Sequence, residues 1–122
     1  MIKLTFCLRR LPHLSREEFQ RYWRETHAPL VASRARTLGI VKYEQVHGGF
    51  DEMSAGIRAS RNAPEPYDGI AEIWFESEAH MAAAGQNPGA AEAARDLLED
   101  ERKFIDLENS PLWFNRVHTI VG

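Results

Sequence analysis

Alternation between apolar and polar residues predicts four β-strands along the chain. In residues 2–8 every second side chain is apolar, which is the two-residue period of a strand: Ile2, Leu4, Phe6 and Leu8. Residues 40–47 and 69–75 are rich in β-branched and aromatic side chains, and residues 114–121 alternate again. We therefore expect a sheet built from these four segments.

A helix is predicted between the first two strands. Ser15 and Glu18 have the Ser-x-x-Glu spacing of a capping box, so the helix should begin at Ser15. Gly39 is suited to end the helix. The apolar positions between keep a helical spacing: Phe19, Tyr22, Trp23, Leu30 and Val31. Pro29 lacks a backbone N–H donor, so we expect a kink at residues 25–28.

A second helical region is predicted between the third and fourth strands. Ser77 can cap a short helix that Gly85 interrupts. Asn87 precedes Pro88, and because proline is favoured at the first helical position, we expect the helix to restart there. Several residues of this helix share one face: Ala91, Ala94, Leu97, Leu98 and Glu101.

The segment from Gly48 to Pro66 lacks a clear periodicity. It consists mainly of Gly, Ser, Ala, Asn, Pro and charged residues. It is longer than most loops of a compact domain. We expect it to be either a lid over a binding site or disordered.

The predicted order of elements is strand, helix, strand, strand, helix, strand, which is the ferredoxin-like βαββαβ arrangement. This α+β fold would place both helices on one face of a four-stranded antiparallel sheet. Large apolar residues occur at both parities of the predicted strands, so the other face needs a cover as well. A second copy of the sheet is the simplest cover, and we therefore expect a homodimer.

Composition indicates a single domain over residues 1–122 and argues against several classes of protein. The chain has 122 residues, of which 43% are hydrophobic and 27% charged, and its formal net charge is −3. That charge gives no concentrated basic surface for nucleic acid. No apolar stretch approaches the roughly 18 residues that cross a bilayer, and the first arginines follow the first apolar segment, the reverse of a signal peptide. We expect no nucleic-acid partner, no membrane and a cytoplasmic location.

His27 is the first candidate for proton chemistry, because histidine changes its charge near neutral pH. It follows Trp23 by four residues, about one helical turn, so both side chains should face the sheet. An inward histidine can act as a base, or it can be a core histidine bonded to a backbone carbonyl. Three other histidines are weaker candidates: His13 and His80 beside helix starts, and His118 in the last strand.

A second group of candidates lies on the second and third strands. Tyr43 and His47 share one strand face but lie roughly 13 Å apart, so they can line one wall without meeting at a single atom. His47 should approach Asp68 across the hairpin, where a carboxylate would fix its tautomer and raise its basicity. Asp68 can instead be a turn residue bonded to its own backbone.

Trp23, Trp74 and Glu72 are the candidates for contacting a substrate. The two indoles offer flat apolar walls, although aromatic residues at such positions are also typical of a plain core. Glu72 shares a strand face with Trp74, so its carboxylate can be buried beside an aromatic wall with a raised pKa, which suits acid or base work. Pairing of Glu72 with an arginine at the dimer interface is the other interpretation.

The sequence lacks the common motifs for metals and cofactors. No two histidines share the i, i+4 spacing with a glutamate that marks a helical zinc site, and Cys7 is the only cysteine. The chain has no Gly-x-Gly-x-x-Gly, no Walker loop and no Gly-x-Ser-x-Gly elbow. We expect no metal and no cofactor. Arg9 and Arg10 can hold an anionic substrate or be solvated turn residues.

Four segments carry a spaced set of aromatic, histidine and acidic residues. They are Phe19-x-x-Tyr22-Trp23-Arg24-x-Thr26-His27-Ala28-Pro29-Leu30, Tyr43-x-x-x-His47, Tyr67-Asp68-Gly69-x-Ala71-Glu72-x-Trp74-Phe75 and Asp100-Glu101-x-x-Phe104-x-Asp106. Together they resemble the EthD family of the dimeric α/β-barrel superfamily. The resemblance implies a dimer with a small hydrophobic pocket in each subunit, between sheet and helices. Taken alone, residues 100–106 look like a charged helix end anchored by Phe104.

The family resemblance favours a cofactor-independent enzyme that moves protons on a small hydrophobic carbonyl or aromatic, polyketide-like compound. Similar barrels include polyketide cyclases, decarboxylases, isomerases and cofactor-free monooxygenases. His27 or His47 would be the base, and Tyr43 would stabilise the developing enolate oxygen. Two alternatives stay open: an EthD-like protein associated with oxidoreductase or monooxygenase chemistry, and a dimer that binds a small hydrophobic ligand without catalysis.

Overall fold

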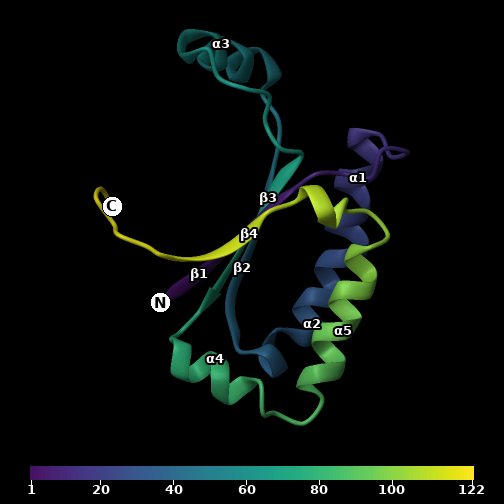
Figure 1. Ribbon diagram of the computed structural model, residues 1–122, viewed down its shortest axis with the longest axis vertical. Helices are drawn as coiled ribbons and strands as arrows, with labels where there is room; N and C mark the ends of the chain where they lie inside the picture. Colours follow the sequence, from purple (N-terminus) through teal and green to yellow (C-terminus); the bar gives the residue numbers. More distant parts are fainter.

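A four-stranded antiparallel sheet forms the centre of the computed structural model, which describes residues 1–122 (Figure 1). The strands lie in the order β2-β3-β1-β4. Their bounds are β1 (Ile2–Leu8), β2 (Ile40–His47), β3 (Gly69–Phe75) and β4 (Leu112–Arg116). With helices inserted after β1 and after β3, this is the ferredoxin-like arrangement, so the expected α+β fold is confirmed.

The helical region after β1 is continuous but contains one wide turn. It consists of α1 (Arg16–Tyr22), the π-helical turn η1 (Trp23–His27) and α2 (Ala28–Leu38). The predicted capping box is present: Ser15 Oγ accepts from the Glu18 backbone N–H, and the Glu18 carboxylate accepts from the Ser15 backbone N–H. The wide turn overlaps the expected kink at residues 25–28 and ends two residues before Pro29, which cannot donate the backbone bond of a regular helix.

The second helical region consists of α4 (Glu78–Ala84) and α5 (Ala90–Glu101). Ser77 caps α4 as predicted, by accepting from the His80 backbone N–H at 3.1 Å. The prediction that α5 starts at Pro88 is wrong, because Gly89 in a left-handed conformation, with φ of 81°, separates the proline from the helix. α2 and α5 pack side by side on one face of the sheet, and α4 lies at one end (Figure 1). None of the helices combines the length and the apolar character that crossing a membrane requires.

The last strand ends earlier in the sequence than the alternation predicts. β4 runs from Leu112 to Arg116, whereas a strand over residues 114–121 was expected. Arg116 pairs with Ile2, the first residue of β1, so residues 117–122 have no neighbouring strand to pair with. These residues extend away from the sheet (Figure 1).

Residues 48–66 contain a helix that the sequence pattern did not predict. α3 (Asp51–Arg61) projects from the end of the sheet between β2 and β3, and none of its residues is buried (Figure 1). Its first turn is acidic and its last turn basic, with Arg58 and Arg61, which is the arrangement that the helix dipole favours. The segment is therefore neither the expected disordered stretch nor a lid on the helix-covered face, since α3 stands away from the rest of the protein.

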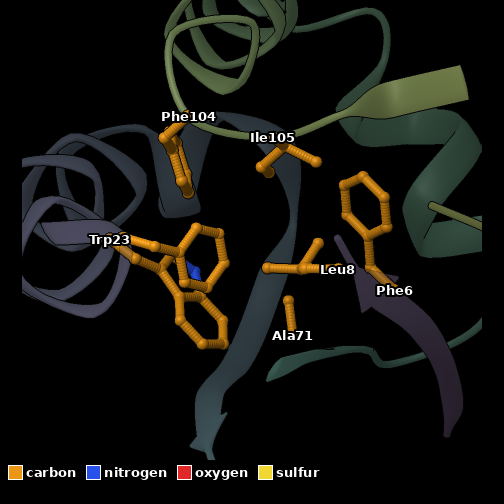
Figure 2. Packing of buried hydrophobic residues seen from close by; sticks show 7 residues of the cluster. Phe6, Leu8, Trp23, Ala71, Phe104 and Ile105 are labelled. Atoms are coloured by element: carbon orange, nitrogen blue, oxygen red, sulfur yellow. The ribbon is translucent and has the colours of Figure 1, made fainter. Parts of the chain in front are cut away.

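The hydrophobic core fills the space between the sheet and the helices (Figure 2). Its buried cluster consists of Phe6, Leu8, Phe19, Trp23, Ala71, Phe104 and Ile105. Burying one large apolar side chain contributes about 1.5–3 kcal/mol. Packing of Trp23 and Phe104 against the strands therefore positions η1 and the end of α5 relative to the sheet.

The two faces of the sheet differ because successive side chains of a strand point to opposite sides. In β3 the residues on the helix side are Ala71, Ile73 and Phe75, and those on the other side are Ile70, Glu72 and Trp74. No helix packs on this second face, which is called the open face below (Figure 1).

Candidate functional site

A small cavity of about 40 Å³ lies between the helix side of the sheet and the helices. Its lining is hydrophobic apart from His27 and Glu101, and Tyr43 adds a phenol. Trp23 and Ala71 are among the buried lining residues, whereas Tyr43 and Glu101 are half-buried and leave one end accessible. One water needs about 10–15 Å³ of cavity. The space therefore takes a carbonyl group with its neighbouring carbon, while a whole small ligand, which needs about 300–1,000 Å³, must extend beyond it.

His27 ends η1 and points inward, as its spacing from Trp23 predicts, with only 5% of the residue exposed. Its Nδ1 lies 2.7 Å from Oδ2 of Asp100. The imidazole also packs against Phe104, with 5.0 Å between ring centres. The partner of His27 is thus a carboxylate, and not the backbone carbonyl of the alternative interpretation.

Asp100 lies near the end of α5 and is itself buried, with 8% of the residue exposed. Its Oδ1 accepts a hydrogen bond of 2.6 Å from the hydroxyl of Tyr22. Burial acts to raise the pKa of Asp100, but the hydrogen bonds from Tyr22 and His27 and the charge of Lys103 outweigh burial and hold the pKa below its usual value. Asp100 is therefore an ionised acceptor at neutral pH.

Tyr22 remains a donor to this carboxylate over the whole neutral range. Burial, together with the hydrogen bond to Asp100 and its negative charge, raises the pKa of Tyr22 to about 12. Tyr22 therefore holds one oxygen of Asp100 while His27 occupies the other.

The ionised Asp100 fixes the tautomer of His27. Burial lowers the pKa of His27, although the hydrogen bond and charge of Asp100 oppose this, so the imidazole is neutral at pH 7. A carboxylate can only accept, so Nδ1 of His27 carries the hydrogen and donates to Asp100. Nε2 is left with a lone pair, which is how a carboxylate orients a histidine base in acid–base enzymes.

Glu101, the last residue of α5, lines the cavity with His27. Its carboxyl takes part in none of the ion pairs of the protein, unlike that of the neighbouring Asp100. Burial raises the pKa of Glu101 to about 7, Asp100 adds to this effect and Arg102 opposes it. An apolar cavity thus contains both a neutral imidazole and a carboxyl that is partly protonated at neutral pH, which together can act as base and acid.

Gln45 links Tyr43 and His47 on β2. Its Nε2 donates to Tyr43 Oη at 2.9 Å, and its Oε1 lies 2.7 Å from His47 Nε2. The His47 ring stacks on Trp23 at 4.3 Å between ring centres and does not line the cavity. Burial and the charge of Arg24 lower the pKa of His47. The strand face thus holds both residues without direct contact, as expected, and Gln45 is the connection that the spacing argument missed.

Asp68 does not approach His47, contrary to the expectation. Its two carboxylate oxygens accept from Arg10 instead, from the backbone N–H at 2.8 Å and from the guanidinium at 2.6 Å. Arg10 offers two hydrogen-bond donors, one of them charged, and together they bind the Asp68 carboxylate more strongly than a neutral imidazole would. His47 pairs with Gly69 in the sheet register, and Asp68 serves to join the start of β3 to the end of β1.

Glu72 and Trp74 lie on the open face, so neither lines the cavity of its own subunit. Glu72 forms an ion pair with Lys3 at 2.9 Å. The ammonium groups of Lys3 and Lys42 lie 5.3 and 4.6 Å from the ring centre of Trp74. Strand alternation separates these two residues from Ala71 on the cavity side. Of the three residues expected to contact substrate, only Trp23 is at the cavity.

A larger depression, of about 380 Å³, lies at the base of α3 and is polar. It contains three arginines, and each is paired with a carboxylate: Arg10–Asp68 at 2.6 Å, Arg16–Asp51 at 2.9 Å and Arg58–Glu65 at 3.4 Å. Arg9 stacks on the ring of Tyr67 at 4.2 Å. The arginines considered for an anionic substrate are thus engaged within the protein. Nowhere in the chain are three or more His, Cys, Asp or Glu side chains grouped to hold a metal ion.

Sequence reasoning missed Tyr22, Asp100 and Glu101 as site residues. Tyr22 was assigned to the apolar side of its helix, and residues 100–106 were assigned to a charged helix end. The sequence does contain one indication of the site: Glu101 shares a helix face with the apolar Leu97. A carboxylate on an apolar face is unusual, because an unpaired buried charge is costly.

Comparisons with known proteins agree with the fold. A family model, the EthD domain, matches residues 11–108. A search of curated proteins gave no significant match. Among solved structures the chain is similar to an EthD family protein from Bacillus halodurans, with 16% identity over 97% of this chain and 99% of that chain and a TM-score of 0.60.

Two further structures share the fold. One is a dimeric protein of unknown function with a ferredoxin-like fold from Bacteroides fragilis, with 9% identity, 95% of each chain covered and a TM-score of 0.57. The other is SnoaB, a cofactor-independent oxygenase from Streptomyces nogalater, with 18% identity, 97% of this chain and 96% of that chain covered and a TM-score of 0.51. Because the EthD model matches most of its length, the chain belongs to the EthD family.

Proposed function

We propose that the protein is a cofactor-independent enzyme that transfers protons on a small hydrophobic carbonyl or aromatic, polyketide-like compound, in a cyclase, isomerase or decarboxylase type of reaction. The observation that carries this proposal is the Asp100–His27 pair at an apolar cavity, with Nδ1 of the imidazole engaged and Nε2 available. A positioned base of this kind contributes about 10²–10⁴ to a rate.

The proposed step begins at the carbon beside the substrate carbonyl. His27 Nε2 takes a proton from this carbon, the C–H electron pair forms a C=C bond, and the carbonyl π pair moves to the oxygen as an enolate. Asp100 stabilises the imidazolium that forms, and Tyr43 can donate its hydroxyl hydrogen to the oxygen. Return of the proton to the same or another carbon completes the reaction, so electrons balance without an oxidant or reductant.

A homodimer is part of the proposal. The open face carries Val46 and Trp113, which are 44% and 47% exposed, and a second sheet would cover them. The similar ferredoxin-like protein from Bacteroides fragilis is described as dimeric. We infer that each subunit contributes its own His27 cavity, with the two sheets packed through their open faces.

Proton exchange on a simple ketone tests the catalytic role. Acetophenone in D₂O has three exchangeable methyl protons, and their replacement by deuterium is followed by NMR. We expect the protein to accelerate exchange over buffer, and His27→Ala to lower the accelerated rate by about 10²–10⁴ with the fold retained. His118→Ala, in the exposed C-terminal segment, is the matched control. Exchange at the wild-type rate in His27→Ala would remove His27 from the mechanism, and no acceleration by the wild type would remove the proton-transfer proposal.

Two other candidate functions predict different results in assays on the same purified protein. Similarity to SnoaB favours a cofactor-independent oxygenase, in which the carbanion made by His27 would react with O₂. Oxygen consumption with an acidic phenol or a 1,3-diketone would identify it. Saturable binding of acetophenone without exchange or oxygen uptake would favour a ligand-binding dimer.

A further inference from the structure

Three polar groups reach the cavity from three separate elements. His27 comes from η1, Tyr43 from β2 and Glu101 from α5, and the remaining lining is hydrophobic. His27 is committed to Asp100 through Nδ1, and Tyr43 accepts a hydrogen bond from Gln45. Glu101 is half-buried, and it takes part in none of the side-chain hydrogen bonds or ion pairs described above. Because no buried polar side-chain atom of the protein lacks a partner, its carboxyl is accessible from outside and free to meet a ligand.

The electrostatic surroundings of the cavity disfavour a negative ligand. No lysine or arginine lines it, and the lining imidazole of His27 is bonded to the carboxylate of Asp100. The strands beneath contribute hydrophobic residues such as Phe6 and Ile73. Two exposed cations follow Glu101 in sequence without lining the cavity: Arg102, and Lys103, whose ammonium lies 3.7 Å from Oδ1 of Asp100. A carboxylate on the substrate would therefore enter a largely apolar space in which no lining residue offers it a counter-ion.

We propose that the protonated carboxyl of Glu101 donates to the substrate carbonyl oxygen while His27 removes the neighbouring C–H proton, and that the cavity consequently selects uncharged, enolisable ketones. This inference rests on the proposed function. The O–H proton of Glu101 passes to the carbonyl oxygen as the C–H proton passes to Nε2 of His27. The products are a neutral enol, a Glu101 carboxylate and a His27 imidazolium, and reversal of both transfers at the same or another carbon restores the enzyme.

Glu101 is the group at the cavity whose pKa lies inside the neutral range, because burial holds it at about 7. Burial lowers the pKa of His27 and raises that of Tyr43, while the hydrogen bonds to Asp100 outweigh burial and lower the pKa of that carboxyl. All three shifts move titration away from the interval between pH 7 and pH 8.5. Ligand affinity that depends on a protonated Glu101 should therefore fall across this pH range.

A matched pair of aryl ketones tests the inference by binding, without requiring turnover. Acetophenone and benzoylformate share the ring and the ketone, but a carboxylate replaces the methyl group in the second. At pH 6 we expect acetophenone to bind at least ten times more tightly, as followed by NMR titration. Its affinity should fall at least five-fold between pH 6 and pH 8.5 in the wild type.

Two glutamine variants separate hydrogen bonding from proton transfer. Glu101→Gln keeps a donor but cannot titrate, so acetophenone should bind with little dependence on pH, and methyl exchange should fall at least ten-fold. Glu99→Gln, on the exposed side of the same helix, should match the wild type in both measurements. A circular dichroism spectrum establishes that each variant is folded.

The outcomes that overturn the inference differ from those that overturn the proposed function. Equal affinity for the two ketones, no binding of acetophenone at any pH, or a pH profile and exchange rate unchanged in Glu101→Gln would each overturn the role of Glu101. Loss of exchange in His27→Ala beside a normal Glu101→Gln would leave the proton-transfer proposal intact. Binding that depends on Glu101 without any exchange would leave the selection of uncharged ketones standing and overturn the catalytic step.

Discussion

At the scale of residues, the site depends on which nitrogen of His27 carries the proton. Asp100 decides this, because its carboxylate is ionised, held from the other side by Tyr22 and only 2.7 Å from Nδ1. A neutral imidazole with a lone pair on Nε2 is the state that a base needs at pH 7. The contact joins residues 73 positions apart in the chain, so no local pattern could predict it.

Asp100→Asn should abolish the function of His27 as a base while the imidazole stays in place. The Tyr22 hydroxyl would donate to the amide oxygen, leaving the amide NH₂ toward Nδ1, so the imidazole hydrogen would move to Nε2. We expect acetophenone exchange to fall by about 10²–10⁴. The unfolding free energy should fall by only about 1.5–3 kcal/mol, the contribution of hydrogen bonds to a charged group. Asp96→Asn, on the same helix and paired with Arg34 at the surface, is the control, and a wild-type exchange rate in Asp100→Asn would contradict the assignment.

Glu101 and His27 should make the free energy of unfolding depend on pH in opposite directions. The folded-state pKa of Glu101, about 7, lies above its ordinary value of 4.5, so its favourable contribution is complete below pH 4.5 and is lost as pH rises through 7. The lowered pKa of His27 works the other way, and stability is lost as pH falls below 6.5. Between pH 4.5 and pH 8 the unfolding free energy of Glu101→Gln should therefore rise relative to the wild type by roughly 2 kcal/mol, after allowance for partial exposure.

Urea unfolding at several pH values measures this difference. Glu99→Gln again serves as the control, because the residue is exposed on the same helix. Parallel stability curves for the wild type and Glu101→Gln over this pH range would show that the carboxyl is not perturbed by burial.

At the scale of elements, signals that are local in sequence predicted structure well. The alternation in β1 and the capping box at Ser15 are properties of a few adjacent residues, and the structure contains both. The end of β4 was wrong because it is set by the first residue of β1. The helix α3 was missed because Met53 and Ile57 are its only large apolar residues, which is too short a pattern to predict a helix, and neither of them is buried. The buried face of α5 also differs, with Ala90 and Ala93 buried, since a run of alanines does not distinguish its faces.

Gly69→Ala should loosen the contact between η1 and the start of β3. A Cβ at Gly69 would lie 2.8 Å from Cη2 of Trp23 and 3.1 Å from the carbonyl oxygen of Val46, so the indole must shift. Such overpacking costs about 1–3 kcal/mol, and the stacking of Trp23 on His47 would be disturbed. Urea unfolding measures the loss. Gly49→Ala, where nothing lies within 4 Å of the added carbon, should be neutral, and equal stability of the two variants would count against close packing at Gly69.

At the scale of the whole molecule, the helices cover one face of the sheet and leave the other without a cover (Figure 1). The charges on the open face are largely paired within the subunit, as in Lys3–Glu72 at 2.9 Å. Between them stand large apolar side chains such as Trp74 and Trp113. A two-fold symmetric interface packs one surface against the same surface of a second subunit, so it should not bury unpaired charges. The open face meets this requirement, because its charges are largely paired within the subunit and its other side chains are partly apolar.

Trp113→Asp should weaken the expected homodimer. Trp113 lies opposite Thr5 in the sheet register and is 47% exposed in the single subunit, so an aspartate there would bring an unpaired charge into the packed sheets. We expect the dissociation constant measured by sedimentation to rise at least ten-fold, which corresponds to about 1.4 kcal/mol. Ala91→Asp, exposed in the first turn of α5 on the helix layer, adds the same charge far from the open face and should leave the dimer unchanged. If the wild type sediments as a folded single subunit at micromolar concentration, the open face is not a dimer interface.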